Sequence, residues 1–330
     1  MNEQPKNMKA LFYNYPWAMD VPGGGERQML AYRHYLPQFG VQADLYDMWN
    51  PALDDYQIFH AFSVMPGVIE MSDYAKRRGL KLVVSTNLWM TQSTKQDYPF
   101  KQIWNLLQLA DKVIVNSDTE GNVLSDVFSM DRGKFHTVYN AAEPDFTIPC
   151  HPQKFRDTFG IDSPYVLNVA NIEPRKNQLR FIEILREERP DLMIVIAGKI
   201  RDFAYGNACI EAGGDKLRII GSLPYASEML RSAMNGCAFF AMPSLLETPS
   251  IAAIEASAMG AKILLTEVGS TREYFGDSVT YVNPTSTESM RTAIRSIETA
   301  SNAGSVWAAH TRFIWPMVMP DLVRCYQSLF

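Results

Sequence analysis

Short apolar runs alternate with longer segments of helical periodicity along nearly the whole chain. The first run, Lys9–Tyr15, is followed by a helical pattern from about Gly25 to Phe39. This order, repeated many times, is typical of parallel β-sheets covered by helices. Further strands are expected at Val41–Tyr46, Gln57–Phe62, Leu80–Thr86, Lys112–Asn116 and Phe135–Tyr139. Together these segments predict one doubly wound, Rossmann-like α/β unit.

A second series of the same kind begins near residue 165. Its strands are expected at Tyr165–Ala170, Leu192–Gly198, Leu217–Gly221, Cys237–Met242, Lys262–Thr266 and Val279–Val282. Four prolines interrupt the rhythm between the two series, at positions 144, 149, 152 and 164. The sequence therefore predicts an N-terminal domain over 1–145, a linker over 146–163 and a C-terminal domain over 164–314. The 330 residues suffice for two cores, and a cleft between two such domains is a common place for ligands.

Composition narrows the class of protein. The net charge of -5 argues against a nucleic-acid partner, which requires a clustered basic face. The four cysteines are scattered without paired spacing, no two histidines stand at ligand spacing, and Asp-x-Asp does not occur, so no metal or other cofactor is expected. The N-terminus is polar and no run approaches a membrane span. A cytoplasmic protein is expected, with at most peripheral contact at the inner face of the membrane.

Two carboxylates bracket the segment Glu247-Thr248-Pro249-Ser250-Ile251-Ala252-Ala253-Ile254-Glu255. Thr248 is suited to a helix N-cap, and Pro249 to the first helical position, where its missing N–H costs nothing. Glu247 then lies just outside the helix and Glu255 about two turns inside it. The N–H groups near Ser250 and Ile251 would be available to an anion, at the carboxyl end of a buried strand. An isolated pair of this kind is more often a solvated helix residue and a favourable charge at a helix N-terminus, but the strands that flank this segment favour a ligand site.

Two further segments follow strands at the same kind of position. Arg175 and Lys176, in Asn171-Ile172-Glu173-Pro174-Arg175-Lys176-Asn177, come just before a helix, where cations and free N–H groups can neutralise a diphosphate. Gly24 and Gly25 belong to a turn of three glycines after the first strand, where backbone can approach a ligand closely. Solvated charges and plain turn chemistry are the alternative interpretations.

Taken in their order along the chain, these motifs resemble those of the retaining glycosyltransferases of the GT-B fold, in particular the large family 4. The resemblance covers most of the chain. Its most specific element is the Glu-x7-Glu motif with its flanks, from Pro243 to Gly260, followed by Gly269-Ser270-Thr271-Arg272-Glu273. It implies two Rossmann-like domains facing across a cleft, with a C-terminal helix at about 315–330 that packs back on the first domain.

The resemblance also implies roles for individual residues. Glu255 would bind the nucleotide ribose, Glu247 the transferred sugar, and Arg175 with Lys176 the diphosphate. Ser250 and Ile251 would offer amides, and Gly221 to Tyr225 would border the base. Asn87 stands where many members carry a histidine near the reaction centre, and Asn171 where many carry an additional arginine. His60 is expected to be a packed strand residue.

The expected function is a metal-independent, anomer-retaining transfer of a sugar from a nucleoside diphosphate donor to a glycan or lipid-linked hydroxyl. A sugar-nucleotide epimerase and a silent subunit that binds a glycan or a partner transferase remain alternatives. A glycoside hydrolase also uses two carboxylates, and eight steps along one helix would separate Glu247 and Glu255 by about 12 Å, more than the usual separation. Placement of Glu247 on a loop would shorten this distance, so the spacing disfavours a hydrolase but leaves it open.

Overall fold

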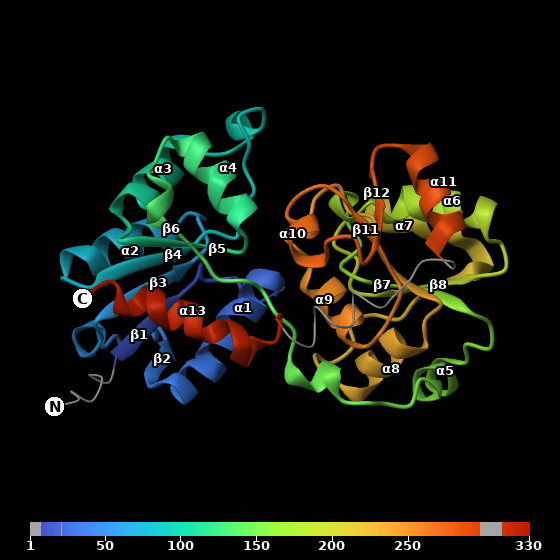
Figure 1. Ribbon diagram of the computed structural model, residues 1–330, viewed down its shortest axis with the longest axis horizontal. Coiled ribbons are helices and arrows are strands. Elements are labelled where there is room, and N and C mark those ends of the chain that lie inside the picture. The colour runs from blue at the N-terminus through green and yellow to red at the C-terminus, as the bar shows by residue number, and fades with distance from the viewer. Residues whose placement is uncertain (1–7, 21, 298–311) are drawn as a thin grey trace. The chain divides into compact units, whose positions relative to one another are not determined.

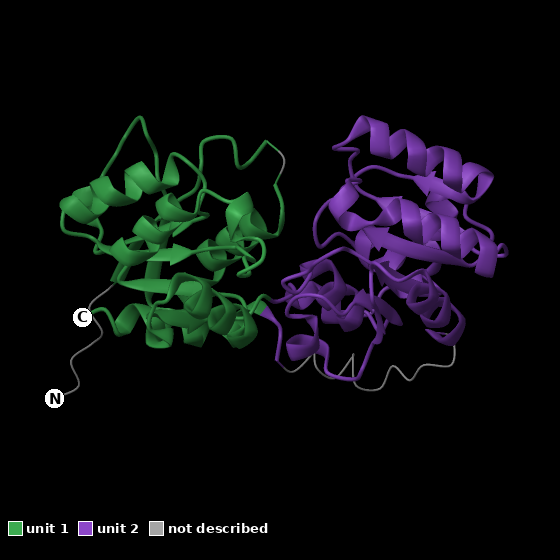
Figure 2. Ribbon diagram, turned by 90° about the horizontal axis from the view of Figure 1, so that it is seen from above, with its two compact units in different colours: residues 1–140, 315–330 green, residues 141–314 purple. Residues whose placement is uncertain are grey.

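The computed structural model describes residues 8–20, 22–297 and 312–330. The chain divides into two compact units, which Figure 2 shows in different colours. Unit 1 comprises residues 1–140 and 315–330, and unit 2 comprises residues 141–314. The C-terminal segment thus returns to the N-terminal unit.

Unit 1 is built on a parallel sheet. Its six strands, counted over the described residues, lie in the order β2-β1-β3-β4-β5-β6 (Figure 1). The strands are β1 (Met8–Tyr13), β2 (Val41–Leu45), β3 (Ile58–Phe62), β4 (Lys81–Ser85), β5 (Lys112–Val115) and β6 (Phe135–Thr137). The helices are α1 (Gly24–Tyr35), α2 (Val68–Arg77), α3 (Phe100–Leu109), α4 (Asp118–Phe128) and α13 (Trp315–Gln327). Alternate strand residues face opposite sides, so each side of the sheet buries its own layer of helices.

Unit 2 repeats this plan. Among the described residues its six strands lie in the order β12-β11-β10-β7-β8-β9, again parallel. They are β7 (Tyr165–Val169), β8 (Met193–Ala197), β9 (Leu217–Ile219), β10 (Phe239–Met242), β11 (Ile263–Thr266) and β12 (Thr280–Val282). The helices are α5 (Gln153–Phe159), α6 (Gln178–Glu188), α7 (Phe203–Gly213), α8 (Glu228–Gly236), α9 (Ile251–Ala258), α10 (Thr271–Phe275) and α11 (Thr287–Ser296). The predicted doubly wound α/β fold is confirmed.

The strand order fixes where ligands are expected. In unit 2 the chain runs outward from β7 to β8 and β9, then returns to place β10 on the other side of β7. The connections that leave β7 and β10 therefore diverge, which opens a crevice at the carboxyl ends of these two strands. The segments with Arg175 and Glu247 follow these two strands. In unit 1 the same reversal falls between β1 and β3.

The expected linker over 146–163 is wrong as a description of that stretch. It contains helix α5, which packs against α8 within unit 2. Phe155 is fully buried there, and its N–H donates a hydrogen bond to Ser232 Oγ at 2.9 Å. Gly160, in the left-handed conformation, ends the helix. The prolines flank α5 or stand at its N-cap, as Pro152 does, so they mark helix borders rather than a free linker.

Helix α13 is attached to unit 1 through a buried polar contact. His60 of β3 pairs through Nδ1 with the hydroxyl of Tyr326 at 2.6 Å and through Nε2 with Ser85 Oγ at 2.9 Å. Complete burial lowers the pKa of His60 to about 3, so the ring is neutral near pH 7. Figure 1 shows α13 alongside α1, which it contacts. His60 is therefore a packed strand residue, as expected.

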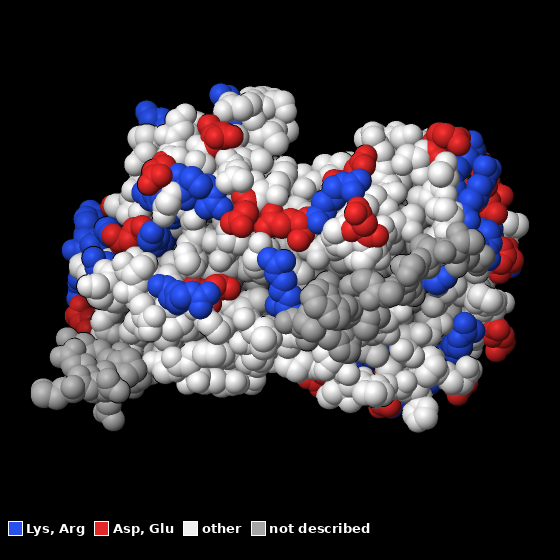
Figure 3. All heavy atoms as spheres, in the orientation of Figure 1, with Lys and Arg blue, Asp and Glu red and all other residues white. Residues whose placement is uncertain are grey.

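No described helix combines the length and the apolar character needed to cross a bilayer. Acidic and basic side chains are interspersed on the surface drawn in Figure 3.

Replacing Tyr326 by Phe removes the hydroxyl and leaves His60 Nδ1 without this partner. We expect the variant to lose about 1–2 kcal/mol of unfolding free energy, because an orphaned buried polar atom costs more than the hydrogen bond contributed. Urea unfolding followed by tryptophan fluorescence measures the loss, with the exposed Gln327→Ala as control. Equal unfolding midpoints for Tyr326→Phe and wild type would show that the contact does not hold α13.

Candidate active site

Charged side chains from two loops meet at the carboxyl ends of β7 and β10. Lys176 Nζ donates a hydrogen bond to Glu247 Oε1 at 2.7 Å, and Arg175 Nη1 lies 4.0 Å from the same oxygen. Lys176 belongs to a single 3-10 turn, Pro174–Lys176, after β7. The Leu245 N–H donates to the carbonyl of Arg175 at 2.9 Å, which joins the two loops through their backbones. The structure therefore brings together three of the predicted site residues.

Burial and charge act against each other on Glu247, whose exposed fraction is 6%. Burial, the largest single influence, raises its pKa, but the charges of Lys176 and Arg175 and the hydrogen bond from Lys176 together outweigh burial and hold the pKa below its ordinary value. The carboxylate is thus ionised at neutral pH. An ionised carboxylate accepts hydrogen bonds from hydroxyl groups and is unsuited to act as a general acid.

The backbone of Glu247 is fixed by the loop that follows β11. Its N–H donates to Val268 at 3.2 Å, and its carbonyl accepts from the Ser270 N–H at 3.1 Å. Gly269 lies between these contacts with φ of +106°, and a Cβ there would stand 2.0 Å from the Glu247 carbonyl oxygen. Only glycine fits at this position without moving Glu247.

Helix α9 begins two residues later than the sequence predicted. Ser250, not Thr248, is the N-cap, because its hydroxyl accepts a hydrogen bond from the Ala253 N–H at 3.3 Å. Pro249 precedes this cap, and Glu255 is consequently just over one turn inside the helix rather than two. Within the described chain, the N–H groups of Ile251 and Ala252 donate to no protein acceptor. They remain available to an anion, as expected for Ile251.

Glu255 lies on the same helix and is buried, with an exposed fraction of 3%. Glu247 and Glu255 therefore sit on the loop and the helix that the sequence assigned to them. The seven residues between them are not all helical, because α9 starts only at Ile251.

The expected free N–H groups after Lys176 are occupied in part. At the start of α6, the hydroxyl of Tyr205 accepts from the Leu179 N–H at 2.9 Å. Asn177, in the left-handed conformation, separates the turn of Arg175 and Lys176 from α6. The Leu179 N–H is therefore not offered to a ligand.

Gly221 and Tyr225 lie in the connection between the edge strand β9 and α8. Gly221 has φ of +71°, and the ring of Tyr225 packs on Phe146 with centroids 6.3 Å apart. Their position after a strand's carboxyl end agrees with the expectation, but their role at a base stays a prediction.

In unit 1, Gly25 at the start of α1 and Asn87 in the loop after β4 lie close together. Asn87 is exposed and left-handed, with φ of +45°, and a Cβ on Gly25 would stand 2.9 Å from Asn87 Nδ2. Gly24 is the first residue of α1, after the Gly23 N-cap. The glycine turn therefore makes room for the Asn87 amide at the carboxyl edge of this sheet.

A buried polar network lies beneath Asn87 and was not predicted from the sequence. Asn116 Nδ2 lies 3.4 Å from Asn87 Oδ1, and Glu120 accepts from the Asn116 N–H at 2.8 Å and from Thr86 Oγ1 at 3.2 Å. Gln28 Nε2 donates to Asn116 Oδ1 at 2.7 Å. Burial raises the pKa of Glu120 to about 7, although the hydrogen bonds that it accepts oppose the shift. The spacing Ser117-x-x-Glu120 is that of a capping box, a signal that the sequence did contain.

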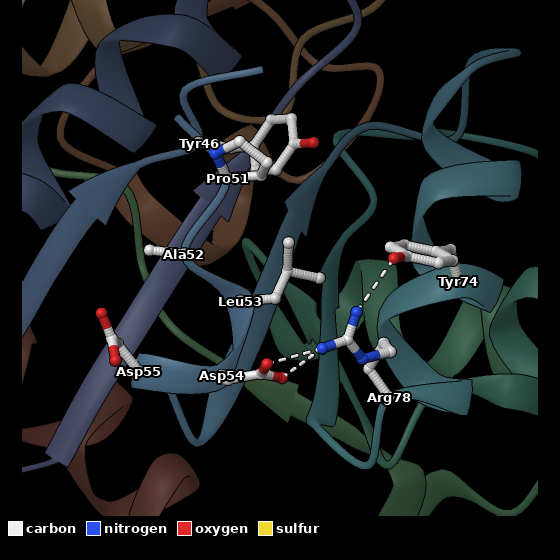
Figure 4. A pocket seen from close by; sticks show the side chains of 8 residues that line it. All are labelled: Tyr46, Pro51, Ala52, Leu53, Asp54, Asp55, Tyr74 and Arg78. Atoms are coloured by element: carbon white, nitrogen blue, oxygen red, sulfur yellow. Dashed lines mark hydrogen bonds and ion pairs between the residues drawn. The ribbon is translucent and has the colours of Figure 1, made fainter. Parts of the chain in front are cut away.

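A pocket of about 340 Å³ lies elsewhere in unit 1, beside the connection from β2 to β3 (Figure 4). Arg78 spans it, with Nη1 3.0 Å from the Tyr74 hydroxyl and Nη2 2.6 Å from both oxygens of Asp54. No predicted site residue lines this pocket, whose lining residues are Tyr46, Pro51, Ala52, Leu53, Asp54, Asp55, Tyr74 and Arg78. Over the described ranges no three His, Cys, Asp or Glu side chains cluster as a metal site would require.

Two family models match the chain. The model described as Glycosyltransferase Family 4 matches residues 19–146, and the one described as Glycosyl transferases group 1 matches residues 152–312. Together with the fold, these matches show that the chain belongs to the group 1 glycosyltransferases of the GT-B fold. The suspected resemblance to GT-B glycosyltransferases of this group is confirmed, and the retention of anomeric configuration stays a prediction. No curated protein matches the chain by sequence.

Several solved structures share the fold over almost the whole chain. Anabaena HepE in complex with UDP-glucose has a TM-score of 0.80 at 15% identity, covering 97% of this chain and 100% of that one. A glycosyltransferase from Rickettsia africae has a TM-score of 0.78 at 15% identity, covering 99% of both chains. Sucrose-phosphate synthase from Thermosynechococcus elongatus has a TM-score of 0.78 at 15% identity, covering 98% and 99%. At these identities the likeness establishes the fold.

Gly269→Ala forces a Cβ against the Glu247 carbonyl, so the loop that carries Glu247 must move. We expect the unfolding free energy to fall by several kcal/mol. This loss is larger than the roughly 1 kcal/mol expected when alanine replaces a glycine that has positive φ but no close neighbour. Gly276→Ala is the matched control, because Gly276 also has positive φ but a Cβ added there would meet no atom within 4 Å. Thermal unfolding of both variants compares them, and equal losses would contradict the close approach at Gly269.

Glu120 makes the stability of unit 1 depend on pH. Its folded pKa of about 7 exceeds the ordinary 4.5, so the folded state holds the proton more tightly. The stabilisation is complete below about pH 4.5 and is lost as pH rises through about 7, up to about 3 kcal/mol in total. Glu120→Gln, which is neutral throughout, is expected to abolish this pH dependence.

Urea unfolding at pH 5 and pH 8 measures the effect of Glu120→Gln, with the exposed Asp126→Asn on the same helix as control. Tryptophan fluorescence reports mainly on unit 1, which contains Trp17, Trp49, Trp89, Trp104 and Trp315. An unchanged pH dependence in Glu120→Gln would rule out Glu120 as its source.

Proposed function

We propose that the protein is a metal-independent, anomer-retaining glycosyltransferase that uses a nucleoside diphosphate sugar as donor. The observation that carries the proposal is the ion pair of Lys176 with the buried Glu247, beside the free N–H groups of α9. Cations and amides suit a diphosphate, and an ionised carboxylate suits sugar hydroxyls. The bound UDP-glucose of the HepE structure supports a nucleotide-sugar donor of this kind.

Each residue has a role in this proposal. Lys176 and Arg175 neutralise the departing diphosphate, the Ile251 and Ala252 N–H groups bind one of its phosphates, and Glu247 accepts hydrogen bonds from the transferred sugar. Glu255, one turn along α9, accepts from the ribose hydroxyls. Because the two cations already provide positive charge at the leaving group, a divalent metal is not required for its departure.

The reaction breaks the bond from the anomeric carbon to the diphosphate oxygen and forms a bond from that carbon to the acceptor oxygen. The acceptor proton passes to the departing phosphate on the same face of the sugar, which retains the anomeric configuration. No protein nucleophile takes part in this scheme. Glu247 serves charge and orientation, consistent with its lowered pKa.

The acceptor side belongs to unit 1 in this proposal. Gly24 and Gly25 leave room for a ligand, and the exposed amide of Asn87 orients a hydroxyl without transferring protons. The acceptor is a glycan or lipid-linked hydroxyl in polysaccharide or glycoconjugate assembly, at the cytoplasmic side of a membrane.

Thermal unfolding with UDP, GDP, ADP, CMP and NAD, in buffer with a metal chelator, tests the donor site. We expect one nucleoside diphosphate to stabilise the wild type, by about 3 kcal/mol at one hundred times its dissociation constant. Glu255→Ala and Lys176→Ala are expected to weaken this stabilisation, whereas the exposed Glu211→Gln on α7 leaves it unchanged.

If no nucleotide stabilised the protein, the donor site would be wrong, and a subunit that binds a glycan or a partner transferase would be the better account. Stabilisation by a diphosphate that required added Mg²⁺ would contradict metal independence but leave the donor site in place.

A further inference from the structure

The ion pair of Lys176 and Glu247 is one end of a longer chain of charges. Glu173 Oε1 accepts from Arg175 Nη2 at 3.0 Å, and Glu173 Oε2 lies 3.4 Å from Arg201 Nη1. Arg175 in turn lies 4.0 Å from Glu247. Arg201 comes from the loop after β8, so three neighbouring strands, β7, β8 and β10, contribute to one cluster.

The carboxylate of Glu173 is held by these two guanidinium groups. Glu173 is the N-cap of its 3-10 turn, yet its side chain makes no capping hydrogen bond. Its side chain is 18% exposed, against 52% for Arg175 and 35% for Arg201. A carboxylate bridging two accessible guanidinium groups occupies the kind of position that a phosphate group prefers, because both anions match the planar donor fork of arginine.

The balance of charge points in the same direction. In these contacts three cations, Lys176, Arg175 and Arg201, pair with two carboxylates, Glu173 and Glu247. A nucleoside diphosphate adds more than one negative charge, so these three cations cannot neutralise both the diphosphate and the two carboxylates. If Glu173 turns away from the two arginines, both become donors to the diphosphate. Glu247, more deeply buried and bonded to Lys176, is less free to move.

We propose that Arg201 is an additional cation of the diphosphate site and that Glu173 is a built-in counter-ion, which competes with the diphosphate for Arg175 and Arg201. This inference rests on the proposed donor site and adds two residues to it, Glu173 at the N-cap of the Pro174–Lys176 turn and Arg201 in the loop after β8. Competition by Glu173 lowers affinity for the diphosphate that remains after sugar transfer. Glu173 thereby promotes release of that product.

Titration calorimetry with UDP and with GDP tests the proposal. Glu173→Gln keeps the size of the side chain and removes its charge, so the diphosphate that wild type prefers is expected to bind about threefold to tenfold more tightly. Arg201→Ala is expected to weaken binding at least about fivefold. Lys199→Ala is the matched control, since it removes an exposed positive charge two residues from Arg201 and is expected to change affinity by less than about twofold.

The matching nucleoside, uridine or guanosine, separates phosphate competition from a general change in the site. Its affinity is expected to be the same in wild type and in Glu173→Gln. Thermal unfolding without nucleotide verifies that each variant is folded.

The outcomes are distinguishable. Diphosphate affinity that is unchanged or weaker in Glu173→Gln would overturn the competition, and equal affinities for Arg201→Ala and Lys199→Ala would remove Arg201 from the site. If wild type bound neither diphosphate, the proposed donor site would fail, and this inference with it.

Discussion

The candidate site depends on one electrostatic constraint, the placement of the buried Glu247 carboxylate against Lys176. A carboxylate with so little exposure is costly to ionise without a cation beside it. The pair joins the loop after β7 to the loop after β10, the two strands between which the sheet order reverses. The fold supplies the crevice, and this pair determines the charge within it. A buried pair of this kind contributes little net stability, so its position at the crevice favours a binding role.

The neighbouring elements preserve this arrangement. Gly269 lets the loop after β11 approach the Glu247 backbone, and Ser250 caps α9 so that its first N–H groups point to the same edge of the sheet. In unit 1 a corresponding role falls to Glu120, whose network holds Asn116 beneath the exposed Asn87. Each unit thus places buried polar groups under exposed ones, which is how a binding surface acquires a defined geometry.

Much of the fold could be predicted from the sequence because parallel strands buried on both faces give continuous apolar runs, such as Phe239–Met242. The linker prediction failed because α5 is short and Phe155 is its buried residue. One apolar position among several prolines is too weak a pattern to predict a helix. The start of α9 was misplaced because Thr248-Pro249 and Ser250 both offer plausible caps, and only the hydrogen bond to Ala253 distinguishes them.

The candidate residues that follow β7 and β10 could be identified because they form contiguous motifs. The role of Arg201 and the occupied Leu179 N–H of α6 could not, since both depend on contacts between distant segments, Arg201 with Glu173 and Leu179 with Tyr205. Glu120 could be identified from the sequence only in part. Its capping-box spacing was visible, but its burial beneath Asn87 required the tertiary structure.

Hydrogen exchange of the intact protein with and without a saturating nucleoside diphosphate tests the central claim most directly, because it locates the binding site by segment. The account predicts slower exchange in residues 171–177 and 247–255 of unit 2, with the amides of Ile251 and Ala252 among the most protected. Protection confined to other strands of unit 2, or to unit 1, would contradict the assignment of the donor site to the carboxyl ends of β7 and β10.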